Sequence, residues 1–206
     1  GWERPNWFGK PGTVPAYEYS YGRQNWFDNS RAEHQGVRQD VGLFDLSSFG
    51  KILLQGPDAA RVLGHISARD VDIPPGRAVY TQWLNARGGI EADLTVTRID
   101  DDQFLIVTGA ASQARDYYWL REHIPNDAHA VATDVTSGYA VIALMGPRSR
   151  TLLRELTPED LSSAAFPFGA SREIDLGYAR VRATRMSYVG ELGWELYIPS
   201  EFALGV

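Results

Sequence analysis

The chain has 206 residues, of which 44% are apolar, and this is enough for the core of one large domain or two small ones. It contains no cysteine, which excludes disulfides, thiol nucleophiles and cysteine-based metal sites. The net charge is −6 and no basic tract occurs, which argues against nucleic acid and anionic membrane surfaces as partners. No apolar run approaches the roughly 18 residues that a membrane span needs.

Residues 1–28 are rich in Pro, Gly, Trp and Tyr and show no regular period. We interpret them as an extended arm that its aromatic residues hold against the body of the protein. From Asn29 the pattern changes to that of a helix, which Asn29 or Ser30 would cap and Gly42 would end. The aromatic residues expected to hold the arm are Trp2, Trp7, Phe8, Tyr17, Tyr19 and Trp26.

Short strands and amphipathic helices follow, because runs with a period of two alternate with runs of helical period. The expected elements are, in chain order, a strand over 48–55, a helix over 59–66, strands over 78–84, 90–98 and 103–108, a helix over 111–124, a strand over 128–135, a strand and helix within 142–153, a loop over 157–169, and strands over 172–175, 178–186 and 194–198.

The strands over 78–84 and 90–98 are predicted to form a hairpin through the Asn-Ala-Arg-Gly-Gly turn at residues 85–89. Asp93 then lies on the polar face of the outgoing strand, and Tyr80 lies on the facing strand. From the local pattern, Asp93 is either a functional carboxylate or a strand residue that simply meets water.

The strand, Gly-Pro turn and helix within 52–63 recur within 142–153, which indicates an internal duplication. The duplication aligns the hairpin at 89–94 with one at 190–196, and each places an acid early in its outgoing strand. If the halves pack with approximate two-fold symmetry, Asp93 and Glu195 approach one central cleft.

The repeat divides the chain into the arm over 1–28, a first lobe over 29–138 and a truncated second lobe over 139–206. The second unit stops near Ser200, which would cap a helix that has barely begun. We therefore expect the sequence to be a piece of a longer polypeptide.

Two motifs together resemble the folate-binding motifs of the glycine-cleavage aminomethyltransferase family. They are Gly-Gly-Ile-Glu-Ala-Asp-Leu-Thr-Val at 88–96, with Tyr80 and Asn85 before it, and Tyr-Val-Gly-Glu-Leu-Gly-Trp-Glu-Leu-Tyr at 188–197. Residues 1–8 and 33–51 resemble more closely the C-terminal folate domain of sarcosine and dimethylglycine dehydrogenases.

The resemblance implies an α+β fold in which two related lobes of mixed or antiparallel sheet, with helices, surround a central folate cleft. A third, C-terminal β-barrel lobe would follow residue 206, and a flavin domain with its FAD would precede residue 1. Asp93 matches the family's catalytic aspartate. The expected tetrahydrofolate-binding residues are Tyr80, Asp93, Leu94, Tyr188 and Glu195.

The expected chemistry is one-carbon transfer from an N-methyl amine, which the flavin domain in cis oxidises to an iminium. A carboxylate beside the folate nitrogen stabilises the positive charge and takes or relays the proton. Glu195 can accept two parallel N–H bonds from the ring. Trp194 is either a stacking wall for the ring or a core residue.

Two other functions remain open: a stand-alone aminomethyltransferase or demethylase, and a folate-binding and assembly module without chemistry of its own. His65, His123 and His129 show no metal-site spacing, so no metal is expected. The expected location is the cytoplasm, or the mitochondrial matrix in a eukaryote.

Overall fold

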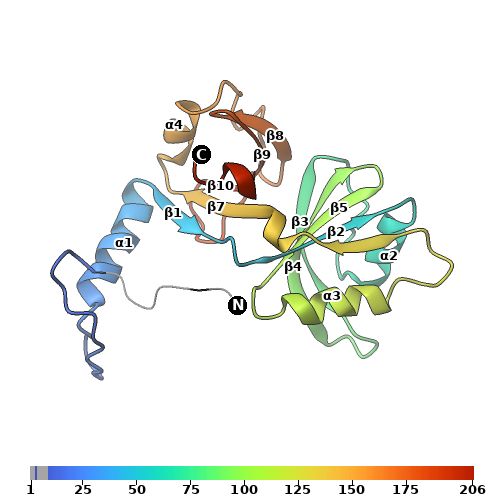
Figure 1. Ribbon diagram of the computed structural model, residues 1–206, viewed down its shortest axis with the longest axis horizontal. Coiled ribbons are helices and arrows are strands. Elements are labelled where there is room, and N and C mark those ends of the chain that lie inside the picture. Colours follow the sequence, from blue (N-terminus) through green and yellow to red (C-terminus); the bar gives the residue numbers. More distant parts are fainter. Residues whose placement is uncertain (1–2, 4–8) are drawn as a thin grey trace.

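The computed structural model describes residue 3 and residues 9–206 of the chain. Two five-stranded sheets with antiparallel pairing form the body, and they lie next to each other (Figure 1). The first sheet has the strand order β3-β4-β5-β2-β6 and the second the order β1-β7-β10-β9-β8. The fold class is therefore α+β, as predicted.

The first sheet takes its strands from one continuous stretch of the chain and carries two helices on one face. Helices α2 (Ala59–Ile66) and α3 (Gln113–Glu122) place Leu63 and Leu120 in the core against it. Its strands are β2 (Gly50–Gln55), β3 (Arg77–Leu84), β4 (Ile90–Asp100), β5 (Gln103–Thr108) and β6 (Val131–Asp134).

The second sheet packs its core against the short helix α4 (Ser149–Arg154), through Leu153 and the completely buried Trp194. Trp194 meets the Phe166 ring edge-on at 6.2 Å between centroids. Of the two roles expected for Trp194, that of a core residue is therefore the correct one. The strands are β1 (Gly42–Asp45), β7 (Tyr139–Met145), β8 (Ser171–Leu176), β9 (Ala179–Thr184) and β10 (Gly193–Pro199).

A third, smaller apolar cluster joins the two sheets. It contains Leu105 and Val107 from β5 together with Val141 from β7 and Tyr197 from β10. The inner faces of the sheets therefore pack directly on each other on one side of the molecule. This contact fixes the sheets around the cavity described below.

The two Gly-Pro turns of the duplicated unit have the same backbone geometry. Gly56 and Gly146 have φ values of 132° and 137°, and a helix begins three residues after each of them. A side chain at either position would meet backbone atoms, the His129 carbonyl oxygen at 2.1 Å and the Asp40 carbonyl oxygen at 2.4 Å. Glycine is required at both turns because of this strained φ and this close approach.

Helix α1 (Phe27–Gln39) begins before the predicted start, with Trp26 at its N-cap and no side-chain cap. The predicted cap at Asn29 or Ser30 is therefore wrong. Strand β1, which the sequence did not predict, pairs with β7 in the second sheet. Residues 42–45 of the range assigned to the first lobe thus extend the second sheet, because β7 offers them an open edge.

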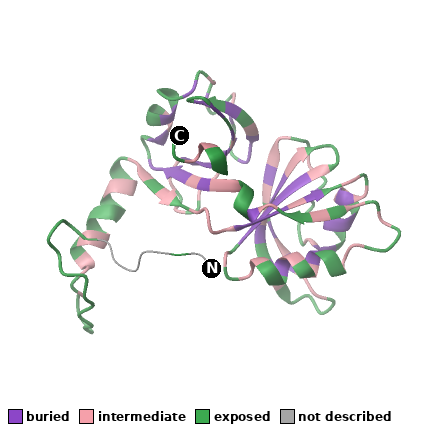
Figure 2. Ribbon diagram, viewed as in Figure 1, coloured by how far each residue is buried: buried purple, intermediate pink, exposed green. Residues whose placement is uncertain are grey.

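Residues 9–26 of the arm, which the structure describes, do not lie on the body of the protein. Tyr19 and Tyr21 are exposed, and residues 9–26 project away from both sheets (Figure 2). Tyr17 and Tyr19 instead pack on each other and on Trp26 at the start of α1. These three rings cover part of one another's apolar surface, so they pack locally and not on the sheets. Trp2, Trp7 and Phe8 lie outside the described residues.

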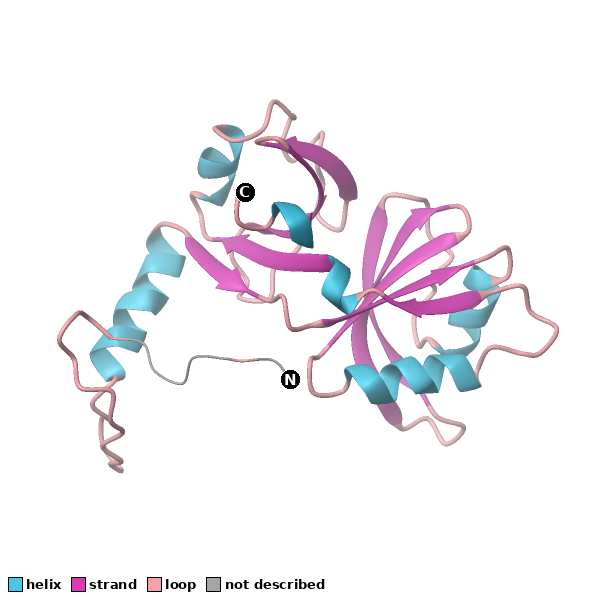
Figure 3. Cartoon of the chain, viewed as in Figure 1, coloured by secondary structure: helices cyan, strands magenta, loops and turns pink. Residues whose placement is uncertain are grey.

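The other predicted elements are present, with ends shifted by at most three residues (Figure 3). A one-turn 3-10 helix, η1 (Thr136–Gly138), connects the sheets, and a second, η2 (Ser200–Phe202), follows β10. Ser200 donates its hydroxyl to the Ser137 carbonyl oxygen instead of capping a helix. Among the described residues, no helix combines the length and apolar character that a membrane crossing requires.

Candidate functional site

A cavity of about 790 Å³ opens between the two sheets. Its wall takes residues from β3, β4 and β5 of the first sheet, and from β10 and the loops around β8 and β9 of the second. All five residues predicted to bind the cofactor line this one cavity: Tyr80, Asp93, Leu94, Tyr188 and Glu195. The volume is in the range of small-molecule and cofactor sites.

Asp93 lies on the face of β4 that is turned away from the first core. Alternation decides this, because Ala92 and Leu94 on either side of it are buried. Gln82 stands directly opposite on β3 and donates its amide to Asp93 Oδ1 at 3.0 Å. The cross-strand pair therefore holds the carboxylate at the cavity wall.

Tyr80 is a second partner of Asp93. Its ring is 56% exposed, and its hydroxyl hydrogen-bonds to the Asp93 carboxylate. This bond and the nearby negative charge raise the pKa of the Tyr80 phenol above its ordinary value of 10.0, so Tyr80 stays a donor. Asp93 is thus oriented by two neutral donors and by no cation among the described residues.

Glu195 has a very different environment, because it is only 7% exposed. Burial raises its pKa above the ordinary 4.5, and the Tyr197 hydroxyl, which donates to Oε2 at 2.7 Å, opposes this shift. Burial and the adjacent carboxylate raise the pKa of Tyr197 well above its usual range. In the described part of the chain, Oε1 of Glu195 accepts no hydrogen bond, so it is free for a ligand donor.

Tyr188 stands at the mouth of the cavity, in the loop between β9 and β10, and is 91% exposed. Its ring is close enough to Tyr80 for the two phenols to interact electrostatically. Two exposed tyrosines from different lobes therefore flank the opening. Such rings offer flat apolar faces to a planar ligand.

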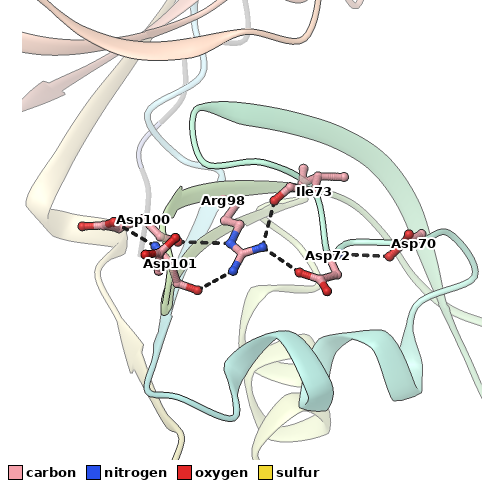
Figure 4. Close-up of polar contacts among 6 residues, drawn as sticks. All are labelled: Asp70, Asp72, Ile73, Arg98, Asp100 and Asp101. Carbon is pink, nitrogen blue, oxygen red and sulfur yellow. Dashed lines mark hydrogen bonds and ion pairs between the residues drawn. The ribbon is translucent and has the colours of Figure 1, made fainter.

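The loop between α2 and β3 forms a wall that sequence reasoning missed. It contributes Arg69, Ile73 and Pro74 to the lining. Arg98 on β4 holds this loop: it donates to Asp72 Oδ1 at 2.6 Å and to the Ile73 carbonyl oxygen at 3.0 Å (Figure 4). A proline-rich turn gives no sequence signal that it borders a site, so only the tertiary contacts identify it.

Phe49, Arg77 and Phe168 also line the cavity and were not predicted. Arg77 begins β3 and donates to the Phe168 carbonyl oxygen at 3.0 Å, which joins the two lobes at the cavity wall. The contact joins residues 91 positions apart, which no local pattern reveals. No group of three or more potential metal ligands occurs in the part of the chain that the structure describes.

The profile of the GCVT N-terminal domain matches residues 1–206, the whole chain. The chain belongs to this family. The GCVT domain is 44% identical over 206 residues to 4-methylaminobutanoate oxidase (formaldehyde-forming) of Paenarthrobacter nicotinovorans. It is 38% identical over 198 residues to mitochondrial dimethylglycine dehydrogenase of Mus musculus. These matches cover 100% and 96% of the chain, but 25% and 23% of the relatives.

A relative of another kind is the mitochondrial pyruvate dehydrogenase phosphatase regulatory subunit of Mus musculus. It is 34% identical over 212 residues, covering 100% of the GCVT domain and 24% of that protein. The domain therefore spans about a quarter of the length of these curated relatives.

The fold is also that of a solved aminomethyltransferase. The glycine cleavage system aminomethyltransferase T from Bartonella henselae superposes with a TM-score of 0.76 at 24% identity. The superposition covers 92% of the GCVT domain and 51% of that chain. At this identity the likeness shows the fold alone, and it confirms the fold that the sequence motifs predicted.

Proposed function

We propose that the GCVT domain carries out tetrahydrofolate-dependent one-carbon transfer as part of a flavin-dependent N-methyl amine dehydrogenase. One observation carries the proposal: Asp93 and Glu195, from corresponding hairpins of the two lobes, line one cofactor-sized cavity. The relatives support it, because the oxidase and the dehydrogenase among them are both named for oxidation of amine substrates.

The residues of the cavity fit a reduced folate. Oε1 of Glu195 has no hydrogen-bond partner among the described residues and is accessible from the cavity, so it can accept an N–H bond from a ligand. Ring N–H groups of a bound folate would donate to it. Tyr80 and Tyr188 would flank the ring, and Leu94 would contribute apolar wall. When bound, tetrahydrofolate supplies the secondary amine nitrogen that captures the one-carbon unit.

Asp93 is the residue to which we assign the proton transfer. Positive charge gathers on nitrogen as the new carbon–nitrogen bond forms, and a carboxylate facing the cavity stabilises that charge. Asp93 would accept the proton that leaves the folate nitrogen and would pass it to the amine nitrogen as the bond from that nitrogen to the transferred carbon breaks and the demethylated amine departs. Gln82 and Tyr80 hold the carboxylate in place meanwhile, because both donate to it without neutralising its charge.

The iminium that enters this site would come from FAD chemistry in a flavin domain of the same polypeptide. The amine-oxidising relatives are about four times as long as the GCVT domain, which leaves room for such a domain in proteins of this kind. The N-methyl substrate would be recognised there, so the cavity itself would meet the iminium and the folate.

An isosteric substitution, Asp93→Asn, tests the assignment in the full-length protein. Formation of methylene-tetrahydrofolate from an N-methyl amine such as dimethylglycine should fall by about 10²- to 10⁴-fold, since a positioned general base contributes that much. Folate affinity should change little, because Asn keeps the shape and the bond to Gln82. Asp127→Asn, at an exposed loop position, is the matched control and should keep full activity.

The regulatory subunit among the relatives favours a second candidate, a folate-binding or assembly module without chemistry of its own. A stand-alone aminomethyltransferase is the third. Unchanged product formation by Asp93→Asn, with folate still bound, would refute the catalytic assignment and favour the module. Transfer that proceeds without any flavin reduction would favour the stand-alone enzyme.

A further inference from the structure

The charges that line the cavity are unevenly distributed. The two carboxylates, Asp93 and Glu195, lie on β4 and β10, which are interior strands of their sheets. The two cations, Arg69 and Arg77, lie beside and on β3, which is the edge strand of the first sheet. One side of the cavity is therefore acidic and the other is basic.

The depth of the two sides also differs. Glu195 is 7% exposed, and it contacts Tyr197, which packs on Val107 of β5. Since β5 lies two strands from β3, this acidic end is about 10 Å from the edge of the sheet. Arg69 is exposed at that edge, and Arg77 is half-buried. Glu195 thus marks the deep end of the cavity, whereas Arg69 lies at its exposed edge, and Asp93 is exposed as well.

Neither arginine is neutralised within the described part of the chain. No carboxylate oxygen of residue 3 or residues 9–206 lies within 4 Å of a guanidinium nitrogen of Arg69 or Arg77, whereas Arg98, Arg115 and Arg180 all form ion pairs. Arg77 uses one N–H on the Phe168 carbonyl oxygen, and the Arg69 side chain makes no hydrogen bond to another described residue. Most guanidinium donors of both residues are therefore available to an anion.

The backbone beneath Arg69 is fixed although its side chain is free. Its N–H donates to Thr81 Oγ1 at 3.1 Å, and the preceding residue, Ala68, donates to the Gln82 carbonyl oxygen at 2.8 Å. Farther along the same loop, Arg98 holds Asp72 and Ile73 (Figure 4). The loop therefore holds the backbone of Arg69 in a constant position at the cavity wall, so binding of an anion orders only the side chain.

We propose that Arg69 and Arg77 form a subsite for the carboxylates of the glutamyl tail of the folate, at the mouth of the cavity. The inference rests on the proposed function and deepens it. A ligand that reaches both ends must be elongated, with hydrogen-bond donors on a ring at the deep end and anionic groups at the mouth. A guanidinium binds carboxylates through parallel N–H bonds, so the two arginines suit the tail.

Binding of two ligands that differ only in the tail tests the subsite in the full-length protein. The ligands are tetrahydrofolate and tetrahydropteroate, which lacks the glutamate, and titration calorimetry gives both Kd values. Arg69→Gln should weaken tetrahydrofolate about two- to fivefold, the range of an exposed charge pair, and leave tetrahydropteroate unchanged. Arg69→Lys should restore part of the loss. The wild-type preference for tetrahydrofolate should shrink as salt rises.

Arg87→Gln is the matched control, because Arg87 is exposed in the β3–β4 turn and does not line the cavity. Arg87→Gln changes the net charge by the same amount as Arg69→Gln. It should leave the affinities for tetrahydrofolate and tetrahydropteroate unchanged. Equal affinity of Arg69→Gln and wild type for tetrahydrofolate would overturn the subsite while leaving the proposed function intact. An equal loss for both ligands would also overturn it. If wild type binds neither ligand, the proposed function itself fails.

Discussion

Asp93 and Glu195 carry the same chemical group in two different surroundings. Asp93 is exposed to the cavity and receives bonds from Gln82 and Tyr80, whereas Glu195 is buried and shares one oxygen with Tyr197. Because burial penalises the charged form, the pKa of Glu195 is raised above 4.5. The two environments are the basis on which we propose recognition for the buried acid and proton transfer for the accessible one.

The raised pKa of Glu195 predicts a pH dependence of folate binding. The carboxylate accepts ring N–H groups only when it is ionised, so affinity should fall as pH drops through a value above 4.5. Glu195→Gln should bind more weakly at neutral pH and lose this dependence on the side chain. Calorimetric titrations of wild type and Glu195→Gln with folate between pH 4.5 and 7.5 measure the affinity of each protein. Ionisation of the ligand affects both proteins equally, so it cancels in the difference between their pH profiles.

The same raised pKa predicts the opposite pH dependence for the stability of the ligand-free protein. A raised folded-state pKa contributes stability that is complete below the unfolded value and is lost as pH rises through the folded value. The free energy of unfolding of wild type relative to Glu195→Gln should therefore decrease as pH rises from 4.5. Parallel curves for the two proteins would show that Glu195 is not buried as described.

At the scale of elements, the repeated Gly-Pro turn is the feature that the sequence and the structure share most closely. Gly56 and Gly146 each begin a strand-to-helix turn with a positive φ and a backbone carbonyl close to the missing side chain. The turns direct α2 and α4 back onto their own sheets. The repeat therefore corresponds to one structural unit of strand, Gly-Pro turn and helix, although different segments flank its two copies.

Gly56→Ala should destabilise the protein by about 1–3 kcal/mol, the cost of a left-handed backbone for a residue with a side chain. The contact with the His129 carbonyl oxygen adds to that cost, because backbone cannot easily move away. Gly64→Ala is the control, since Gly64 lies within α2 with open space around it. It should be neutral or stabilise by up to about 1 kcal/mol. Urea unfolding of both variants provides the comparison.

At the scale of the whole molecule, the chain crosses twice between the sheets, and Lys51 joins the crossings. Its Nζ donates to the Ser47 carbonyl oxygen at 2.8 Å and its N–H donates to Thr136 Oγ1 at 3.0 Å. The side chain is completely buried. Burial lowers the pKa of Lys51 to about 8, although the charges of Asp134 and Asp45 oppose the shift.

Lys51→Met should therefore differ from wild type in how stability depends on pH. Between pH 8 and 10.5 the folded protein releases the Lys51 proton while the unfolded chain retains it. The free energy of unfolding of wild type relative to the variant should rise over this range, by at most about 3 kcal/mol. Chemical unfolding at pH 7.5, 9 and 10.5 measures it. A constant difference would contradict the lowered pKa.

Local pattern predicted most of the elements, because periodicity and turn residues act over short stretches of chain. It identified the hairpin with Asp93, the paired Gly-Pro turns and the acid at Glu195. It missed β1, because whether Gly42–Asp45 forms a strand depends on the edge that β7 offers it. It also misplaced the aromatic arm, since aromatic side chains do not reveal from sequence whether they pack on a body or on one another.

The sequence by itself therefore determined the α+β fold and the repeated Gly-Pro turn, and it named the residues for which we propose a function. Only the tertiary structure decided that Asp93 and Glu195 share one cavity, and that Arg69 and Arg77 form its basic side. The physical reason is that residue type and spacing fix local conformation and which face of an element is apolar. Distances between distant segments depend instead on how the two sheets pack, through the cluster of Leu105, Val107, Val141 and Tyr197 and the contact of Arg77 with Phe168.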